Sequence, residues 1–328
     1  MKARRDFLIA GCAGLSVLAM PIAAFAQRPS AKLHRIGFLG PTSSAAMASR
    51  LEALRAGLRD LGYVEDKNLV IEFRWADGNY DRLPALAAEL VRLKVDVIVT
   101  HSVPGARAAK QATKTIPIVF APVGDAVTTG LVENLARPGG NITGSSFFTP
   151  ELNAKRLELL KDAFPRIRRI AFLFNLNNPA TPLAAMETAA ASLKVELQQF
   201  GMRSPNDLED TFAAITKRGA EAVAVHDDPM LLANVGTIAR LTAKHRIRSI
   251  GFTELAEAGG LMAYGVNLPA MARKAAVQVD KVLKGANPGD LPIERATNFD
   301  LIINRKTAEA LGIKIPQSIL VRADRVIE

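Results

Sequence analysis

Short runs of β-branched and other apolar residues alternate with longer stretches of helical periodicity along most of this chain. Within 45–61, for example, leucines recur at the spacing of one helix face. Short strands separated by helices are typical of βαβ units, which build parallel sheets. The pattern predicts strands at 36–39, 69–73, 95–100, 116–121, 142–144, 169–174, 196–199, 222–225, 249–252, 261–266 and 299–303, and helices at 45–61, 80–93, 105–113, 151–164, 182–193, 206–217, 230–245, 269–283 and 305–311.

The alternation restarts near Thr149 and Pro150, after a turn-rich stretch at 137–141. We therefore predict an α/β fold of two doubly wound parallel-sheet lobes. The elements after 261 exceed what the second lobe needs, so we expect the chain to cross back and form a multi-stranded hinge. The expected bounds are 33–147 with 266–292 for the N-terminal lobe and 148–265 with 293–328 for the C-terminal lobe.

The first 26 residues have the three parts of a secretory signal. A basic head with Lys2, Arg4 and Arg5 precedes the apolar run 7–20, and Ala24-Phe25-Ala26 follows as an A-x-A exit. The run is shorter than the ~20 apolar residues of a membrane span, and a buried N-terminal helix is the alternative that we weigh against a signal. We expect cleavage before Gln27 and a periplasmic protein.

Two features of this signal leave the export route open. Arg4-Arg5 resembles the core of a twin-arginine signal, which exports folded proteins, and an ordinary Sec signal is the alternative. Ile9-Ala10-Gly11-Cys12 resembles a lipoprotein cleavage box, but the apolar run continues past it, so we favour cleavage after Ala26. Cys12 is the only cysteine of the chain, and its removal would exclude disulfides.

The formal charge of +10 could attract nucleic acid, acidic lipid or an anionic solute. The cations are spread along the chain and often stand beside acids, and the cluster Arg166, Arg168 and Arg169 has no interleaved aromatic residues. We interpret the charge as a solvated surface with a general attraction to anionic membranes, and we expect no nucleic-acid partner.

Polar residues follow the expected strands at the places where ligands bind in open parallel sheets. There the N-termini of helices present free N–H groups. Such residues also cap helices whatever the function, so the argument rests on the collection and not on single positions. The candidate ligand-binding residues are Thr42, Ser43, Ser44, His101, Ser102, Val103, Pro104, Val123, Asp125, Phe147, Phe148, Asn175, Asn177, Asn178, Asp227, Asp228, Thr253 and Glu254.

Catalytic motifs are missing from the sequence. It has no G-x-S-x-G, H-E-x-x-H, P-loop or G-x-G-x-x-G, and its four histidines lack a common ligand spacing. His226-Asp227-Asp228 could form a metal group, but we favour a polar strand end whose acids cap the next helix. We expect no enzyme, no catalytic residue, no cofactor and no metal.

Three stretches resemble one known family, that of ABC transporter substrate-binding proteins, which includes the tryptophan- and tyrosine-binding lipoproteins. They are 125–144 with Leu135-Ala136-Arg137-Pro138-Gly139-Gly140-Asn141, 259–265, and the tail 299–324. The resemblance implies a type I periplasmic-binding fold with a three-stranded hinge and a closing cleft. The chain departs from the family pattern at Ala126 and Asn267, so the preference for aromatic amino acids is not carried over.

This resemblance implies a solute receptor that closes around its ligand and delivers it to an ABC permease in the inner membrane. A sensory receptor that passes its ligand-bound state to a membrane sensor kinase or chemoreceptor is the alternative. Helix N-termini and hydroxyls predict an amino acid or aromatic carboxylate as the ligand, with Val103, Phe147 and Phe148 against its apolar body. We expect a monomer.

Overall fold

The computed structural model describes residues 32–328, so the predicted signal, with Cys12, lies outside the described residues. Two sheets organise this part of the chain. The fold is α/β with parallel-dominated sheets, as predicted. Within residues 32–328 no helix is long and apolar enough to cross a membrane.

The first sheet has the order β11-β5-β4-β3-β1-β2, and all its neighbours pair in parallel. Valine, isoleucine and phenylalanine dominate its central strands, which are buried on both faces because helices cover both sides. The strands are β1 His34–Gly40, β2 Leu69–Trp75, β3 Val97–Thr100, β4 Ile118–Gly124, β5 Ile142–Phe147 and β11 Glu294–Arg295.

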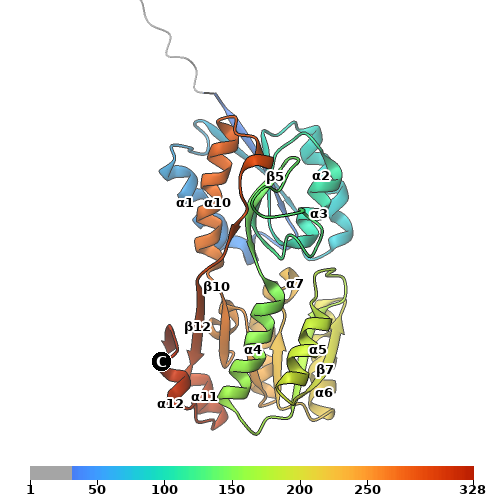
Figure 1. The fold of residues 1–328 in the computed structure, drawn as a ribbon, viewed down its shortest axis with the longest axis vertical. Coiled ribbons are helices and arrows are strands. Elements are labelled where there is room, and N and C mark those ends of the chain that lie inside the picture. Colours follow the sequence, from blue (N-terminus) through green and yellow to red (C-terminus); the bar gives the residue numbers. More distant parts are fainter. Residues whose placement is uncertain (1–31) are drawn as a thin grey trace, which may run out of the picture. The chain divides into compact units, whose positions relative to one another are not determined.

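Helices α2 (Leu83–Arg92) and α3 (Ser102–Ala112) cover one face of this sheet, where Leu90 and Ala106 pack against Ile98 and Phe120. The other face is covered by α1 (Ala48–Asp60) and by α10 (Leu268–Leu283), which comes from much later in the sequence. Figure 1 shows α1 and α10 side by side on this sheet. We call this sheet and its helices the first lobe.

The second sheet has the order β13-β12-β10-β9-β8-β6-β7 and is parallel except for the antiparallel pair β10 and β12. Its strands are β6 Arg169–Asn175, β7 Glu196–Met202, β8 Ala222–Val225, β9 Arg248–Gly251, β10 Met262–Val266, β12 Phe299–Asn304 and β13 Arg325–Ile327. Its helices are α4 Thr149–Ala163, α5 Leu183–Ser192, α6 Leu208–Lys217, α7 Pro229–Ala233, α8 Val235–Lys244, α9 Thr253–Glu257, α11 Arg305–Leu311 and α12 Gln317–Leu320.

Helices α4 and α5 pack on one face of the second sheet and α6 and α8 on the other. We call this sheet and its helices the second lobe. Between residues 32 and 328 the chain passes from one sheet to the other in three places: from β5 into α4, from β10 into α10 and from β11 into β12 (Figure 1). These three connections form the expected hinge.

The structure corrects the predicted elements in several places. The helix predicted over 230–245 is wrong as a single element, because it breaks at Asn234 into α7 and α8. There the Asn234 side chain donates to the Met230 carbonyl at 2.8 Å and competes with backbone bonding. Helix α3 begins at Ser102 and not at 105, and α9, β11, α12 and β13 were not among the predicted elements.

That the two lobes are separate domains with the expected bounds stays a prediction. The first sheet extends slightly past the expected boundary at 292, because β11 lies just after this boundary and pairs with β5. The strand therefore extends the first lobe by a few residues before the last crossing.

Candidate functional site

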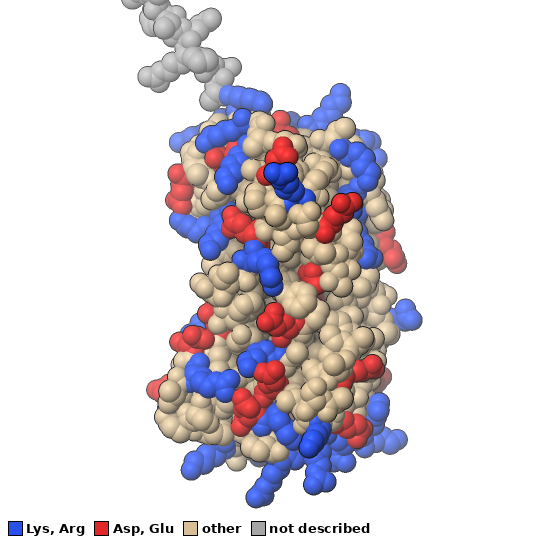
Figure 2. Space-filling model, in the orientation of Figure 1, with Lys and Arg blue, Asp and Glu red and all other residues tan. Residues whose placement is uncertain are grey.

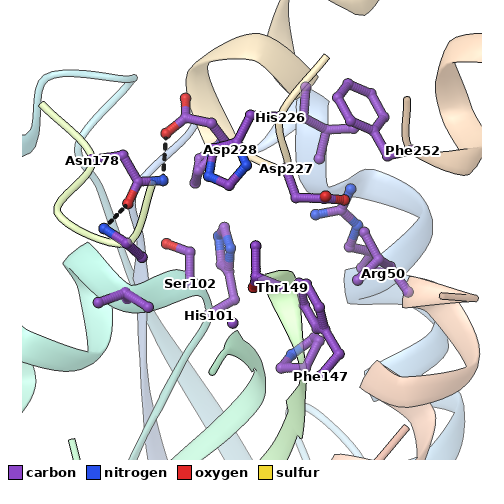
Figure 3. Close-up of a pocket in the computed structure, with 17 residues that line it drawn as sticks. Arg50, His101, Ser102, Phe147, Thr149, Asn178, His226, Asp227, Asp228 and Phe252 are labelled. Atoms are coloured by element: carbon purple, nitrogen blue, oxygen red, sulfur yellow. Dashed lines mark hydrogen bonds between the residues drawn. The ribbon is translucent and has the colours of Figure 1, made fainter. Parts of the chain in front are cut away.

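A cavity lies where the carboxyl ends of strands from both sheets face each other, and residues of both lobes line it. Figure 3 shows His101 and Ser102 on one side of it and His226 and Asp228 on the other. Its lining is Arg50, His101, Ser102, Val103, Pro122, Gly124, Phe147, Thr149, Asn178, Ala180, His226, Asp227, Asp228, Pro229, Leu232, Phe252 and Leu268.

Ser102 begins α3 with a backbone φ of +56°, a left-handed conformation that costs a non-glycine residue energy. Its hydroxyl oxygen is buried at the cavity, and no hydrogen-bond partner for it exists within residues 32–328. Strained residues cluster at functional sites, where the surroundings hold them in place. Ser102 therefore offers a pre-positioned hydroxyl to a bound molecule.

Two buried histidines, one from each lobe, line the cavity. Burial lowers the pKa of His101 to about 3, with a further contribution from the Arg50 charge. Burial also lowers the pKa of His226 to about 4, although the nearby Asp227 opposes this effect. Both rings are neutral at pH 7, so each has one N–H donor and one bare nitrogen acceptor.

Three of these ring nitrogens, namely Nε2 of His101 and both nitrogens of His226, are buried without a hydrogen-bond partner in the described part of the chain. A buried polar atom left unpaired costs free energy, and a bound polar ligand can remove that cost. The two histidines can therefore recognise neutral polar groups of a ligand.

Asp228 connects the two lobes. It follows β8 and is the N-cap of α7, as the sequence predicted for an acid at this strand end. Its carboxylate accepts hydrogen bonds from the Tyr80 hydroxyl at 3.0 Å, the side-chain amides of Asn175 and Asn178, and the backbone N–H groups of Met230 and Leu231.

Burial raises the pKa of Asp228, and the hydrogen bonds from Tyr80 and from Asn175 and Asn178 act against this effect. All five neighbours donate to the carboxylate, which suits its ionised form. Burial also raises the pKa of Tyr80 well above its usual value, with the Asp228 charge as the second cause, so the Tyr80 hydroxyl stays a donor.

The Asp227 carboxylate forms an ion pair with a buried arginine. The Arg156 side chain is fully buried and bonds both carboxylate oxygens of Asp227, at 2.5 and 3.1 Å. Arg156 also donates to the carbonyls of Tyr264 and Val225, so its guanidinium is fixed by several acceptors. This fork orients the Asp227 carboxylate at the cavity wall.

Arg50 forms the second bridge between the lobes. It projects from α1 of the first lobe and pairs with Glu254 of α9 in the second lobe at 2.9 Å. Its Nε lies buried at the cavity with no hydrogen-bond partner among the residues described. The guanidinium thus bridges the two lobes through one nitrogen and leaves another N–H at the cavity free to donate to a bound molecule.

The end of β4 has an irregular register beside the cavity. The register between β4 and β5 shifts between Phe120 and Val123; Pro122, within the shift, and Gly124, just after it, line the cavity. Opposite Phe120, Gly144 has φ +134°, and a Cβ there would lie 2.3 Å from the Phe120 nitrogen. Only glycine fits this close approach.

The predicted site residues fall into three groups. Those that line the cavity are His101, Ser102, Val103, Phe147, Asn178, Asp227 and Asp228. Asn175 and Glu254 lie beside it, bonded to Asp228 and Arg50. The remaining candidates are not in the lining: Thr253 shares a groove with Glu254, Asp125 and Phe148 share a hollow of the first lobe, and Thr42, Ser43, Ser44, Pro104, Val123 and Asn177 lie elsewhere on or within their lobes.

Arg50 lines the cavity and bridges the lobes, but it was not among the predicted site residues. A signal for it existed, because Arg50 shares a helix face with Met47 and Leu54, both buried. A charged residue on the apolar face of a helix needs a buried partner. His226 and Phe252 were also left out of the candidate set.

The lining does not assemble a recognisable catalytic group. Within residues 32–328 no three His, Cys, Asp or Glu side chains are placed to hold a metal ion. Both cavity carboxylates are already occupied by donors, and the histidines are neutral. The arrangement is suited to holding a small polar molecule by hydrogen bonds from both lobes.

The chain is similar to the tyrosine-binding protein of Clostridioides difficile (strain R20291), with 26% identity over 288 residues, 87% of this chain and 83% of that protein. Its fold is similar to that of an ABC domain from Streptococcus pneumonia in complex with L-Trp, with a TM-score of 0.83, 27% identity, and coverage of 90% and 100% of the two chains.

A leucine-binding protein of Thermotoga maritima shares the fold at 12% identity, with a TM-score of 0.60 and coverage of 85% and 87% of the two chains. The fold is thus that of type I periplasmic binding proteins. The family described as ABC transporter substrate binding protein matches residues 35–327. The chain therefore belongs to the family of ABC transporter substrate binding proteins.

Proposed function

We propose that this protein is the extracytoplasmic receptor of an ABC importer and captures a small organic solute between its two lobes. The observation that carries the proposal is the cavity at facing strand ends, spanned by Tyr80–Asp228 and Arg50–Glu254. A ligand that touches both lobes favours the closed arrangement by its differential affinity for it. Closure is then the state that a permease recognises.

The charges at the cavity favour an amino acid over a simple carboxylate. Arg50 is the only cation among the lining residues described, and Glu254 balances it. Asp227 and Asp228 add two carboxylates, of which Arg156 balances one. A net-neutral zwitterion suits this balance better than an anion, with its carboxylate at Arg50 Nε and its ammonium toward the wall that carries Asp227 and Asp228.

The relatives support this ligand class, since one binds tyrosine and another was crystallised with L-Trp. Phe147, Phe252 and Leu268 supply apolar contacts for the ligand body. Aromatic carboxylates without an amino group are the second group of ligands that we propose. We further propose export to the periplasm, a monomeric state, and an inner-membrane permease as the partner.

A thermal-shift screen followed by calorimetry tests the ligand class. L-tyrosine, L-tryptophan and L-leucine are compared with benzoate, phenylpropionate and indolepropionate, and maltotriose serves as an unrelated control. At a concentration of about 100 times its Kd, a ligand that binds only the folded state stabilises it by about 2.7 kcal/mol. A preference for maltotriose, or consumption of the bound ligand, contradicts the proposal.

Uptake measurements test the importer role. Deletion of the gene should abolish high-affinity uptake of the solute identified by calorimetry, and expression of the parent chain should restore it. Unchanged uptake together with a lost signalling response would instead identify a sensory receptor. N-terminal sequencing of the exported protein should begin at Gln27, whereas a start at a lipid-modified Cys12 contradicts the proposed processing.

A further inference from the structure

The parallel strands β6 to β10 of the second sheet begin at the edge that faces away from the cavity, and cations gather at this edge. Figure 2 shows Lys and Arg side chains projecting from this end of the second lobe. We call the surface formed by the following six exposed residues the basic end: Arg166, Arg168, Lys194, Lys217, Arg218 and Arg246.

Contacts show that the basic end is one continuous surface. Arg166, Arg168 and Lys194 line the same groove, at the starts of β6 and β7. Gly219, directly after Arg218, lies beside the guanidinium of Arg169 at the start of β6. The Thr216 hydroxyl, directly before Lys217, lies 2.9 Å from Nδ1 of His245, directly before Arg246, so Arg246 lies beside the end of α6.

The six cations of the basic end are not held in ion pairs by nearby acids. Across residues 32–328, none of its six side chains forms an ion pair. Two acids at the strand starts offset only part of the charge of these six cations: Glu196 accepts from Gln198, and Glu221 accepts from the backbone N–H groups of Arg168 and Arg169. The Arg169–Glu221 pair is long, at 4.0 Å.

Helix dipoles account for only part of this charge. Lys217 and Arg218 stand at the end of α6, where a cation is favoured by the partial negative charge of the helix. Arg166 and Arg168 lie instead in the connection between α4 and β6 and cap no helix. Their exposure and lack of acidic partners need another explanation.

We propose that the basic end docks on an anionic phospholipid surface. Anionic headgroups attract exposed Lys and Arg side chains, and the attraction is additive over several of them. The cations are exposed and spread over several strand starts, which fits an extended surface better than one small anion. Because the cavity opens at the other edge of the strands, docking leaves the ligand site accessible. The docking proposal rests on the proposed function in one respect, namely that the extracytoplasmic location brings the protein to a membrane.

The test is co-sedimentation of the exported protein with vesicles of phosphatidylethanolamine, with or without phosphatidylglycerol, at low and high salt. Binding should need phosphatidylglycerol and be lost at high salt. The triple variant Arg166→Gln, Arg168→Gln, Lys194→Gln should bind about 100-fold more weakly, since each cation near the surface contributes about fivefold.

A matched triple variant controls for total charge. Arg92→Gln, Lys94→Gln, Arg137→Gln removes two arginines and one lysine from the exposed surface of the first lobe. Lys94 matches Lys194 in local structure, because each lysine lies just after a helix and has a positive φ, 50° for Lys94 and 54° for Lys194. This variant should keep vesicle binding, and both variants should keep the parent's melting temperature and ligand affinity.

Equal loss in both variants, or equal binding to vesicles without phosphatidylglycerol, overturns the proposal. Binding to heparin or DNA without binding to anionic vesicles also overturns it and identifies a soluble polyanion as the partner. Ligand affinity is measured on the same samples. A chain that binds vesicles but none of the tested solutes refutes the proposed ligand class and leaves the docking surface intact.

Discussion

The Tyr80 hydroxyl donates a hydrogen bond of 3.0 Å to Oδ2 of Asp228, so a side chain of the first lobe completes the cap of a helix in the second. The same carboxylate binds the amides of Asn175 and Asn178 at the strand ends around the cavity. Opening of the cleft must break the bond from Tyr80, whereas the bonds within the second lobe can persist.

We expect Tyr80→Phe to weaken ligand binding about 10- to 100-fold. A hydrogen bond to a charged group contributes about 1.5–3 kcal/mol, and here it favours the closed form. Calorimetry measures the affinity. Tyr63→Phe is the matched control, because Tyr63 donates to the Asp280 carboxylate at 2.9 Å entirely within the first lobe. It should lower the melting temperature without a comparable loss of affinity.

We expect Arg50→Gln to reduce affinity for a carboxylate-bearing ligand at least 10-fold. The change removes a charge-assisted hydrogen bond at the cavity and the bridge to Glu254. Arg55→Gln, on the same helix, removes a half-exposed pair with Glu65 and should leave the affinity within twofold of the parent, about 0.4 kcal/mol. Equal dissociation constants for Arg50→Gln and the parent would place the ligand carboxylate elsewhere.

Ser102→Gly should raise stability and lower affinity at once. Glycine relieves the positive φ of this position, which favours the folded state by about 1 kcal/mol. The lost hydroxyl costs about 0.5–1.5 kcal/mol of binding. Ser102→Ala should lose the same affinity without the part of the gain in unfolding free energy that comes from relief of the positive φ. Denaturant titration and calorimetry on both variants measure these two effects.

Asp227→Asn should lower the free energy of unfolding by about 3–5 kcal/mol, because it leaves the fully buried Arg156 guanidinium without its counter-charge. Asp162→Asn breaks an exposed pair with Arg322 and should cost no more than about 1 kcal/mol. Urea denaturation measures both. Equal costs would show that Arg156 is satisfied by its carbonyl acceptors alone.

Acid should destabilise the ligand-free protein through its buried histidines. The unfolded chain binds a proton at His226 below about pH 6.5, whereas the folded protein does so only near its pKa of about 4. The unfolding free energy therefore falls as the pH falls through this window, by about 1.4 kcal/mol per pH unit for each such histidine. His101, with a pKa of about 3, contributes in the same direction.

The raised pKa of Asp228 acts in the opposite direction, because the folded protein then binds the proton more readily than the unfolded chain. Comparison of His226→Gln with the parent cancels this contribution. We expect the variant's unfolding free energy to depend on pH less steeply, by about 1.4 kcal/mol per unit between pH 6 and pH 4. An unchanged slope in urea titrations would contradict neutral burial of His226.

Local sequence signals were sufficient for much of the fold. The strand at 222–225 and the helix at 305–311 have their predicted bounds. The strand is uniformly apolar and buried, and the helix begins at the cap Asn304 and ends at the left-handed Gly312. The short β13 could not be predicted in this way, because its pairing with β12 comes from the assembled sheet.

The site was less accessible to sequence reasoning than the fold. Strand-end residues such as Ser102 and Asp228 could be found because the topology of parallel sheets places them at the cleft. Tyr80 could not, because its partner Asp228 lies 148 positions away and only the approach of the lobes brings them together. The burial of Arg50 could be predicted from the buried residues on its face of α1. Its partner Glu254 could not, because that residue lies in the other lobe.

The order in which the lobes can be completed follows from the position of α10 in the sequence. This helix covers the face of the first sheet on which Ile36, Phe38 and Val99 lie. A nascent chain that has emerged only as far as β5 has α1 but not α10 to cover this face, so part of the face stays exposed although every central strand of that sheet has been synthesised. Completion of the first lobe requires α10, which is synthesised after most of the second lobe. We therefore expect the two lobes to finish folding together, late in synthesis or after it.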